Sequence, residues 1–220
     1  MSRRPTLLAL ATLAALAPMA APPPTLAQSP MVVEGQSVVT KEDGPCWDDA
    51  NRFVDCGNGT VTDTTTGLVW LQVANCTELP GTGGTNFNDW PTALQAAAGL
   101  EDGLCGLSDG SEPGDWRLPT QAEWEATLAW ARDGLTCTGA SAPTWTNDAG
   151  NACITSPSTS FTGVSAVSYW SSTIDVSLTG FADVGNLSTG STTGHVAKFG
   201  NAGIWPVRGE CTDWDSCPSW

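Results

Sequence analysis

The chain has little positive charge. Its 220 residues include eight Lys and Arg against 23 Asp and Glu. Two of the eight, Arg3 and Arg4, belong to the signal peptide argued below, so the exported part keeps six cations and a net charge of −17. Binding to nucleic acid depends on Lys and Arg that displace counterions from phosphates, and anionic lipid headgroups attract the same cations. The composition therefore predicts no nucleic-acid partner and no membrane insertion.

Histidine is scarcer still, since His195 is the only one. Any Ser-His-Asp catalytic arrangement would need it, and its position beside Val196 in a strand-like segment favours a surface or packing role. Paired carboxylates are the other hydrolytic option. However, Glu123 and Glu125 are two residues apart on an expected helix and point to different faces. We therefore expect no catalytic residues and no enzyme activity.

A long apolar run occurs only at the N-terminus. Two arginines precede the run Leu7–Leu16, and the small residues up to Ala27 suit a signal peptidase, so residues 1–27 are expected to be a signal peptide. Prolines interrupt this run before it reaches the length of about 20 residues that spans a membrane. The expected product is secreted, periplasmic or at the cell surface. It has a flexible lead-in over residues 28–45, one domain over 46–209 and a disulfide-containing tail over 210–220.

Eight cysteines all lie in the exported part, and an even number in an oxidising compartment predicts four disulfides. A zinc site needs two ligands separated by about two to four residues. No two of these cysteines are that close, so we expect no metal site. Closing short loops costs the chain the least entropy, which favours the pairs Cys46–Cys56, Cys76–Cys105, Cys137–Cys153 and Cys211–Cys217 among the many that the sequence permits.

Two helices are predicted from their caps. The first is expected to begin after Asn88 or Asp89 and to end at Gly99. The second has a capping box in which Thr120 and Glu123 each bind an orphan backbone amide of the first turn. The apolar face of the second helix and its expected stop are given by Trp124, Leu128, Ala131 and Gly134.

Strands are predicted from alternation and from short apolar runs. Residues 59–63 and 68–71 flank a turn-rich segment and have the pattern of a hairpin. Four further apolar pieces are expected to be strands: Val167–Trp170, Phe181–Val184, His195–Phe199 and Ile204–Val207. Two helices with a mainly antiparallel β-sheet make an α+β domain, which the disulfides staple.

Seven strings occur in order along the chain: Arg52–Asp55, Gly57–Asp63, Thr66–Leu71, Cys105–Gly110, Gly114–Thr120, Tyr169–Thr173 and Trp205–Gly209. Together they resemble the Lcl C-terminal domain family, once catalogued as a domain of unknown function (DUF1566). The resemblance covers most of the exported part. It also implies a C-type-lectin-like fold, above all in the closing segment with Trp205 and Arg208.

The resemblance implies a recognition role. The member that gives the family its name is a bacterial surface adhesin, which binds sulfated glycosaminoglycans through a trimeric C-terminal domain. An adhesin-like module that forms a homo-oligomer and binds an extracellular glycan or a surface protein is therefore one expectation. This chain departs from that member because it shows no collagen-like glycine repeat, and its charge of −17 opposes a polyanionic ligand unless its six cations cluster.

The eleven tryptophans suggest carbohydrate binding. An exposed indole offers a flat apolar face to a sugar ring, and its N–H can donate a hydrogen bond. Tryptophans inside the predicted helices are expected in the core. The candidate ligand residues are Trp145 with Asn147 and Asp148, whose amide and carboxylate would meet hydroxyls, and the tail residues Trp214 and Trp220.

Two arginines of the family strings lie near tryptophans, Arg117 beside Trp116 and Arg208 near Trp205. They could contact an anionic glycan, but a guanidinium that stacks on an indole and binds carbonyls is also a common structural lock. We expect the lock. These four residues and the capping box of the second helix are therefore predicted to be structural.

Calcium is the one cofactor that the composition leaves open, because acidic turns supply oxygen ligands. No EF-hand pattern appears and turn formation explains these residues, so no cofactor is expected. The sequence predicts a non-catalytic recognition module that binds through the loops between Gly134 and Asn201. Two alternatives stay open. An exposed apolar patch without a polar cleft would favour an assembly module of the cell envelope, and a cleft with two carboxyl groups in opposed environments would favour a hydrolase.

Overall fold

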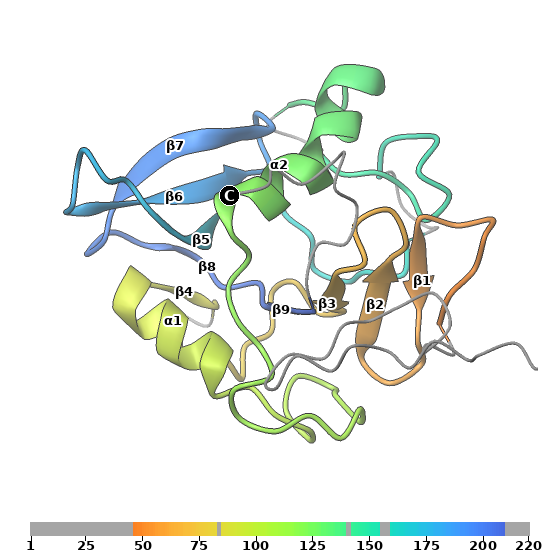
Figure 1. The fold of residues 1–220 in the computed structure, drawn as a ribbon, viewed down its shortest axis with the longest axis horizontal. Helices are drawn as coiled ribbons and strands as arrows, with labels where there is room; N and C mark the ends of the chain where they lie inside the picture. The colour runs from red at the N-terminus through yellow and green to blue at the C-terminus, as the bar shows by residue number, and fades with distance from the viewer. Residues whose placement is uncertain (1–45, 83–84, 140–141, 155–158, 210–220) are drawn as a thin grey trace, which may run out of the picture. The chain divides into compact units, whose positions relative to one another are not determined.

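The computed structural model describes residues 46–82, 85–139, 142–154 and 159–209, which belong to one compact unit (Figure 1). Within these residues the fold is α+β, as predicted, with two α-helices and two sheets rich in antiparallel pairs. No helix in the described ranges is long and apolar enough to cross a membrane. The expected signal peptide, lead-in and tail lie outside the described residues, as do Cys211, Cys217, Trp214 and Trp220.

The first sheet contains β1 (Phe53–Asp55), β2 (Thr60–Asp63), β3 (Val69–Leu71) and β9 (Val207–Arg208), all antiparallel and in the order β1-β2-β3-β9. The predicted hairpin is confirmed, since β2 pairs with β3. Its turn depends on Asp63, whose carboxylate accepts the Thr65 amide at 3.0 Å. It also depends on Gly67, whose φ of 76° an L side chain rarely adopts.

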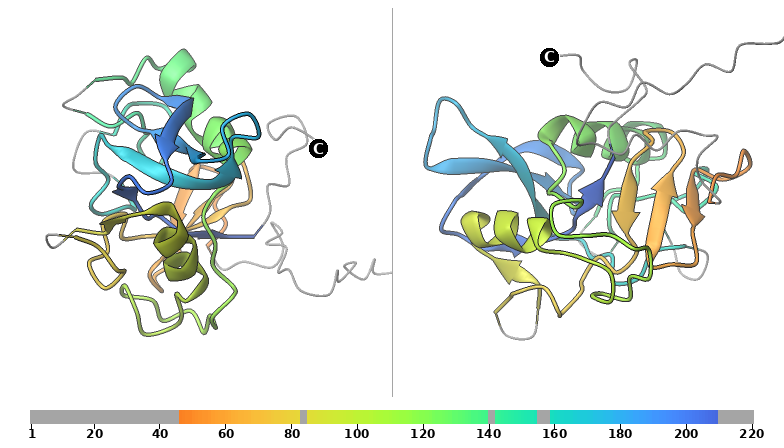
Figure 2. Two further views of the ribbon diagram at one scale, coloured as in Figure 1. Left: turned by 90° about the vertical axis from the view of Figure 1, so that its left-hand side faces the viewer. Right: turned by 60° about the horizontal axis from the view of Figure 1, so that its bottom comes forward.

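The second sheet contains β4 (Phe87–Asn88), β5 (Ser168–Ile174), β6 (Phe181–Asn186), β7 (Ser191–Ala197) and β8 (Ala202–Gly203). Its order is β4-β8-β5-β6-β7, and only β5 and β8 are parallel. Figures 1 and 2 show the orange strands β1 and β2 and the blue strands β6 and β7 at opposite sides of the domain.

The expected strand Ile204–Val207 is wrong. The chain leaves the second sheet after Gly203 and enters the first sheet at Val207, so residues 204–206 cross between two sheets where the sequence suggested one. Trp205 in this crossing is fully buried, and its Nε1 donates to the carbonyl oxygen of a residue in β3 at 2.8 Å. An apolar run marks a buried segment, but it does not specify which sheet that segment joins.

The expected strand His195–Phe199 is shifted. Strand β7 begins earlier, because it pairs with β6 as a hairpin, and it ends at Ala197. Phe199 lies beyond the strand, and its side chain is 88% exposed.

Helix α1 spans Trp90–Ala98 and follows its predicted signals. The Asp89 carboxylate accepts the Thr92 amide at 2.9 Å and thereby caps the helix. Hydrogen bonding by the Thr92 side chain, and then by this amide, lowers the pKa of Asp89. Gly99 follows the last turn, as predicted.

Helix α2 spans Gln121–Ala129 and begins with the predicted capping box, in which the side chains of Thr120 and Glu123 bind each other's backbone amides. The predicted apolar face is buried. The helix continues as a single π-helical turn, η1 (Trp130–Gly134), and so the helical segment ends at the predicted stop. Such turns are rare and occur frequently at functional sites.

A cluster of aromatic rings joins both sheets and α2. Trp205 lies at its centre, with ring centroids 5.0 Å from Trp70 of β3, 6.2 Å from Trp124 of α2 and 5.3 Å from Tyr169 of β5. All four rings are buried. Rings of this size supply most of the apolar area in a core, so the tryptophan content has a structural explanation before any functional one.

Three disulfides are present in the described residues: Cys46–Cys56, Cys76–Cys105 and Cys137–Cys153. They are the pairs that the shortest closures favour. No described cysteine is free. Cys76, Cys105 and the Glu78 carboxylate come close together, but both sulfurs are bonded to each other and the carboxylate accepts the Cys105 amide. This cluster is therefore a structural contact, since metal binding requires thiolates.

Candidate functional site

Trp145 is wrong as an exposed ligand platform. Its side chain is 1% exposed and stacks on Phe53 with ring centroids 5.2 Å apart. The loop that carries Trp145 folds inward, because Thr146 pairs with Cys153 and Trp145 accepts the Ile154 amide. The indole therefore belongs to the aromatic core.

Asn147 and Asp148 also have structural contacts. The Asn147 side-chain oxygen accepts the backbone amides of Asn151 and Ala152 at 3.1 and 3.2 Å, which closes a tight loop. The Asp148 carboxylate accepts the Ser160 amide at 2.7 Å. These groups already have partners, so they do not form the expected ligand site around Trp145.

The arginines of the family strings form locks, as expected of structural residues. Arg117 makes two hydrogen bonds to Glu123, at 2.8 and 2.6 Å, and a third to the carbonyl oxygen of Gly209. It thereby ties the start of α2 to the end of the domain. Arg208 lies 5.3 Å from the ring centroid of Trp116 and 3.1 Å from the Asp109 carboxylate. The indole under Arg208 is thus Trp116 rather than Trp205, which is nearer in sequence.

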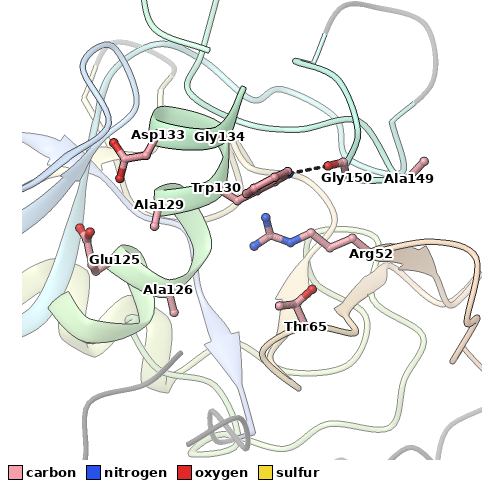
Figure 3. A pocket seen from close by; sticks show the side chains of 10 residues that line it. All are labelled: Arg52, Thr65, Glu125, Ala126, Ala129, Trp130, Asp133, Gly134, Ala149 and Gly150. Carbon is pink, nitrogen blue, oxygen red and sulfur yellow. Dashed lines mark hydrogen bonds between the residues drawn. The ribbon is translucent and has the colours of Figure 1, made fainter. Parts of the chain in front are cut away.

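A groove of about 900 Å³ has α2 and η1 on one side. On the other side are Arg52 just before β1, Thr65 in the turn between β2 and β3, and the loop at 149–150. This volume is in the range of small-molecule sites. Figure 3 shows Ala126, Ala129 and Trp130 between Arg52 and Thr65 on one side and Glu125 and Asp133 on the other. The remaining lining residues are Gly134, Ala149 and Gly150.

Trp130 is the aromatic residue of this groove, and its side chain is 54% exposed. Its Nε1 donates to the carbonyl oxygen of Gly150 at 2.8 Å, as Figure 3 shows. The ring also lies against Gly134, where a Cβ atom would come within 2.5 Å of Cε3. Two contacts therefore fix the indole while half of its surface stays open to solvent. We call this the Trp130 groove.

The sequence patterns do not single out Trp130. It lies six residues after Trp124, on the side of the helix away from the predicted apolar face. That position alone could have marked Trp130 as a candidate. An indole off the buried face of an amphipathic helix must be exposed or covered by another segment.

Arg52, the residue before β1, also lines the groove. Its Nε and Nη2 atoms donate to the Asp63 carboxylate at 3.1 and 2.9 Å, and Nη2 also donates to the carbonyl oxygen of Thr127. Within the described residues, Nη1 has no hydrogen-bond partner. One donor of a held guanidinium is therefore available in the groove, although the charge of Arg52 is balanced by Asp63.

Arg132 joins the two carboxylates of the groove. Its guanidinium donates to Glu125 at 2.6 and 3.0 Å and to Asp133 at 2.6 and 2.8 Å. These hydrogen bonds hold the pKa of each carboxyl below its usual value. The same bonds, first those to Asp133 and then those to Glu125, raise the pKa of Arg132. Both carboxylates are consequently ionised at neutral pH.

His195 lies between two carboxylates outside the Trp130 groove. Its Nδ1 is 2.9 Å from Asp183 and 3.4 Å from Asp175. Burial raises the pKa of Asp183, whereas the hydrogen bond from the Ser177 hydroxyl lowers that of Asp175. The histidine links β7 to β6 and to the residue after β5, which agrees with the expected packing role.

The segment Gly106–Gly110 has the Gly-x-Ser-x-Gly spacing of a hydrolase nucleophile elbow. Such an elbow needs a sharp turn between a strand and a helix. Here the segment belongs to an irregular loop, in which Ser108 donates its amide to Asn58 and Asp109 pairs with Arg208. His195 contacts Asp183 of β6 and Asp175 after β5 instead. The spacing therefore has a structural explanation.

A family model described as the Lcl C-terminal domain matches residues 59–208, which is more than half of the chain. The match includes α2, η1 and most of the groove lining. A comparison with curated proteins finds no match.

Proposed function

Because the chain belongs to the Lcl C-terminal domain family and its disulfides agree with an extracellular or cell-surface module, we propose that it binds a neutral glycan without catalysis. The binding site is the Trp130 groove. The observation that carries this proposal is the indole of Trp130, which is held in place at the groove and yet more than half exposed.

The chemistry of the groove suits a sugar ring. The exposed face of an indole packs against the apolar face of a pyranose, and Ala126 and Ala129 leave room beside it. Polar groups at the edges then fix the orientation, as in other ligand sites. Arg52 Nη1 supplies a donor, and the carboxylates of Glu125 and Asp133 supply acceptors.

The charge of the groove favours a neutral ligand. Arg52 is balanced by Asp63, and Arg132 is shared between two carboxylates. No cation in the groove is in excess, and the exported part carries a charge of −17. A sulfated or sialylated chain would meet net repulsion. For this reason the proposal departs from the polyanionic ligand of the adhesin that names the family.

The same carboxylates support a non-catalytic role. A glycosidase needs one carboxylic acid with a raised pKa and one ionised carboxylate. Glu125 and Asp133 share the same arginine, which lowers the pKa of both. The groove therefore lacks the opposed pair that would favour the hydrolase alternative.

A glycan array with neutral, sialylated and sulfated chains, probed with oxidised Gln28–Trp220 protein at low and physiological salt, tests the proposal. We expect saturable binding to a neutral class that survives physiological salt. Trp130→Ala should weaken it by at least about tenfold. Leu104→Ala is the matched control, because this exposed apolar side chain lies outside the groove and away from the β5–β6 hairpin. Binding only to sulfated chains, or equal loss in both variants, would refute the proposal.

A second candidate is self-association, and one surface favours it. Five of the seven exposed large apolar side chains of the described residues occur at the end of the β5–β6 hairpin and the nearby turn after β7: Ile174, Val176, Leu178, Phe181 and Phe199. Strand β7 is also the edge of its sheet among the described strands, so a second copy could pair with it. Light scattering of wild type and Phe199→Ser tests this, since a monomeric wild type would remove the candidate.

A further inference from the structure

A second hollow lies on the other side of Glu125. It has a volume of about 530 Å³ and is formed by α2, by η1, by the start of β7 and by the turn that precedes β7. Glu125 lines both hollows, and Arg132 of the second is bonded to Asp133 of the first. The two hollows therefore flank one ion-pair network. We call the second one the hydroxyl hollow, after Thr189, Ser191, Thr192 and Thr193 in its lining.

Three cross-links fix the shape of the hydroxyl hollow. Gln121 Nε2 donates to the carbonyl oxygen of Thr192 at 3.1 Å, and the Thr192 hydroxyl donates to Glu125 at 2.7 Å. Arg132 donates to the carbonyl oxygen of Gly190 at 3.0 Å. A Cβ atom at Gly190 would come within 3.0 Å of the Arg132 side chain, and its φ is 72°. The start of β7 and the turn before it are thus tied to α2 and to η1.

Several polar side-chain groups that line the hollow take no part in these cross-links. The hydroxyls of Ser191 and Thr193 have only a long mutual contact at 3.5 Å, and the side-chain oxygen of Gln121 has no partner within the described residues. A hydroxyl can donate and accept, and an amide oxygen can accept. Together they match the hydroxyls along the edge of a sugar. The hollow contains no aromatic side chain, so it would bind by hydrogen bonds where the Trp130 groove binds by stacking.

We infer that one glycan chain occupies both hollows and passes over the ion pair of Glu125 and Arg132. The inference rests on the proposed function and names its ligand class, a neutral oligosaccharide with equatorial linkages, such as a β-1,4-linked chain. Linkages that are equatorial at both C1 and C4 keep a chain extended, with flat apolar ring faces and hydroxyl-bearing edges. A flat face meets Trp130 in the first hollow, and an edge meets Gln121 and Thr193 in the second.

Calorimetric titration with cello-oligosaccharides and with N-acetylglucosamine oligosaccharides, from disaccharide to hexasaccharide, tests the inference. For the wild type we expect the Kd for one of these series to fall by about tenfold with length. The double variant Gln121→Ala/Thr193→Val should lose this gain and keep the disaccharide affinity. Gln95→Ala/Thr179→Val is the matched control, since both residues are exposed and lie outside the two hollows. Thermal unfolding of each variant verifies folding.

The outcomes separate the two proposals. If disaccharide binding depends on Trp130 but the Kd does not change with length, the inference is overturned and the proposed function stands. A length-dependent gain that persists in the double variant also overturns the inference. If neither series binds at any length, this ligand class is wrong, and the glycan array then decides the proposed function separately.

Discussion

Trp145 and Trp130 are both associated with the loop at residues 145–153, the first as part of it and the second as a neighbour bonded to it. Trp145 lies in the loop, is 1% exposed and packs between Phe53 and Trp205. Trp130 reaches the loop from η1, donates to Gly150 and is 54% exposed. The indole of Trp145 thus holds the loop against the core, whereas the indole of Trp130 is held in place by a hydrogen bond to the loop. The two tryptophans differ in what surrounds them, and that difference separates a structural role from a binding role.

The largest expected effect comes from removing the buried member of this pair. Trp145→Ala should destabilise the protein by about 3–5 kcal/mol, because it removes a fully packed ring and leaves a cavity. Trp130→Ala should change the free energy of unfolding by less than about 1 kcal/mol, since the ring is largely exposed. Urea unfolding followed by tryptophan fluorescence measures both. Equal losses in the two variants would mean that Trp130 is a core residue and would remove the basis of the comparison.

Features set by neighbouring residues could be predicted from the sequence. The caps at Asp89 and Thr120, the turn at Gly67 and the apolar face that includes Trp124 all depend on hydrogen bonds or contacts within a few positions. Each of these features needs a particular residue type at a fixed position. The structure confirms these predictions because no distant segment is needed to form the features.

Features set by distant segments could not be predicted. Trp145 lies two residues after Pro143 in a polar, turn-rich stretch and resembles an exposed loop residue. Its burial depends on Phe53 and Trp205, which are far away in sequence. The crossing of residues 204–206 between the sheets depends on which strands accept its ends. The helical period places Trp130 off the apolar face, but only the fold brings Gly150 to its indole.

The Cys137–Cys153 disulfide holds the loop that supports Trp130. Cys137 and Cys153 are separated by 16 residues and enclose Trp145 and Gly150. The double variant Cys137→Ser/Cys153→Ser should lose about 3 kcal/mol, by the loop entropy that the bond removes from the unfolded chain. The double variant should also bind the glycan more weakly at temperatures where it is folded, because without the disulfide Gly150 holds Trp130 less well.

Removal of the Cys76–Cys105 disulfide is the control for this prediction. Its separation of 29 residues predicts a loss of stability of similar size. It lies outside the Trp130 groove, so glycan affinity at the same folded fraction should match the wild type. The support role of the loop would be contradicted if both double variants bound the glycan equally well.

A smaller change isolates the orientation of the exposed indole. In Gly134→Ala the new methyl group would overlap the Trp130 ring, and the ring can move because it is exposed. We expect binding to weaken several-fold while stability stays the same or rises by up to about 1 kcal/mol, since alanine favours helical backbone over glycine. Gly180→Ala is the control, because a Cβ atom there meets no neighbour within 4 Å. Unchanged affinity in Gly134→Ala would show that the resting position of the indole is irrelevant to binding.

The smallest expected effect is the dependence of stability on pH, and it compares the groove with the region around His195. The folded state lowers the pKa of Glu125 from its ordinary value of 4.5, so its stabilisation is present above that pH and is lost as the pH falls through the folded value. Glu125→Gln should therefore lose less stability than the wild type as the pH falls.

Burial raises the pKa of Asp183, so the contribution of this group to stability has the opposite pH dependence. Asp183 destabilises the fold as the pH rises above its ordinary pKa of 3.8. Urea midpoints from pH 7 to pH 3 at constant salt should thus diverge from wild type in opposite directions for Glu125→Gln and Asp183→Asn. Parallel curves for the two variants would mean that the Arg132 network contributes nothing specific to the groove.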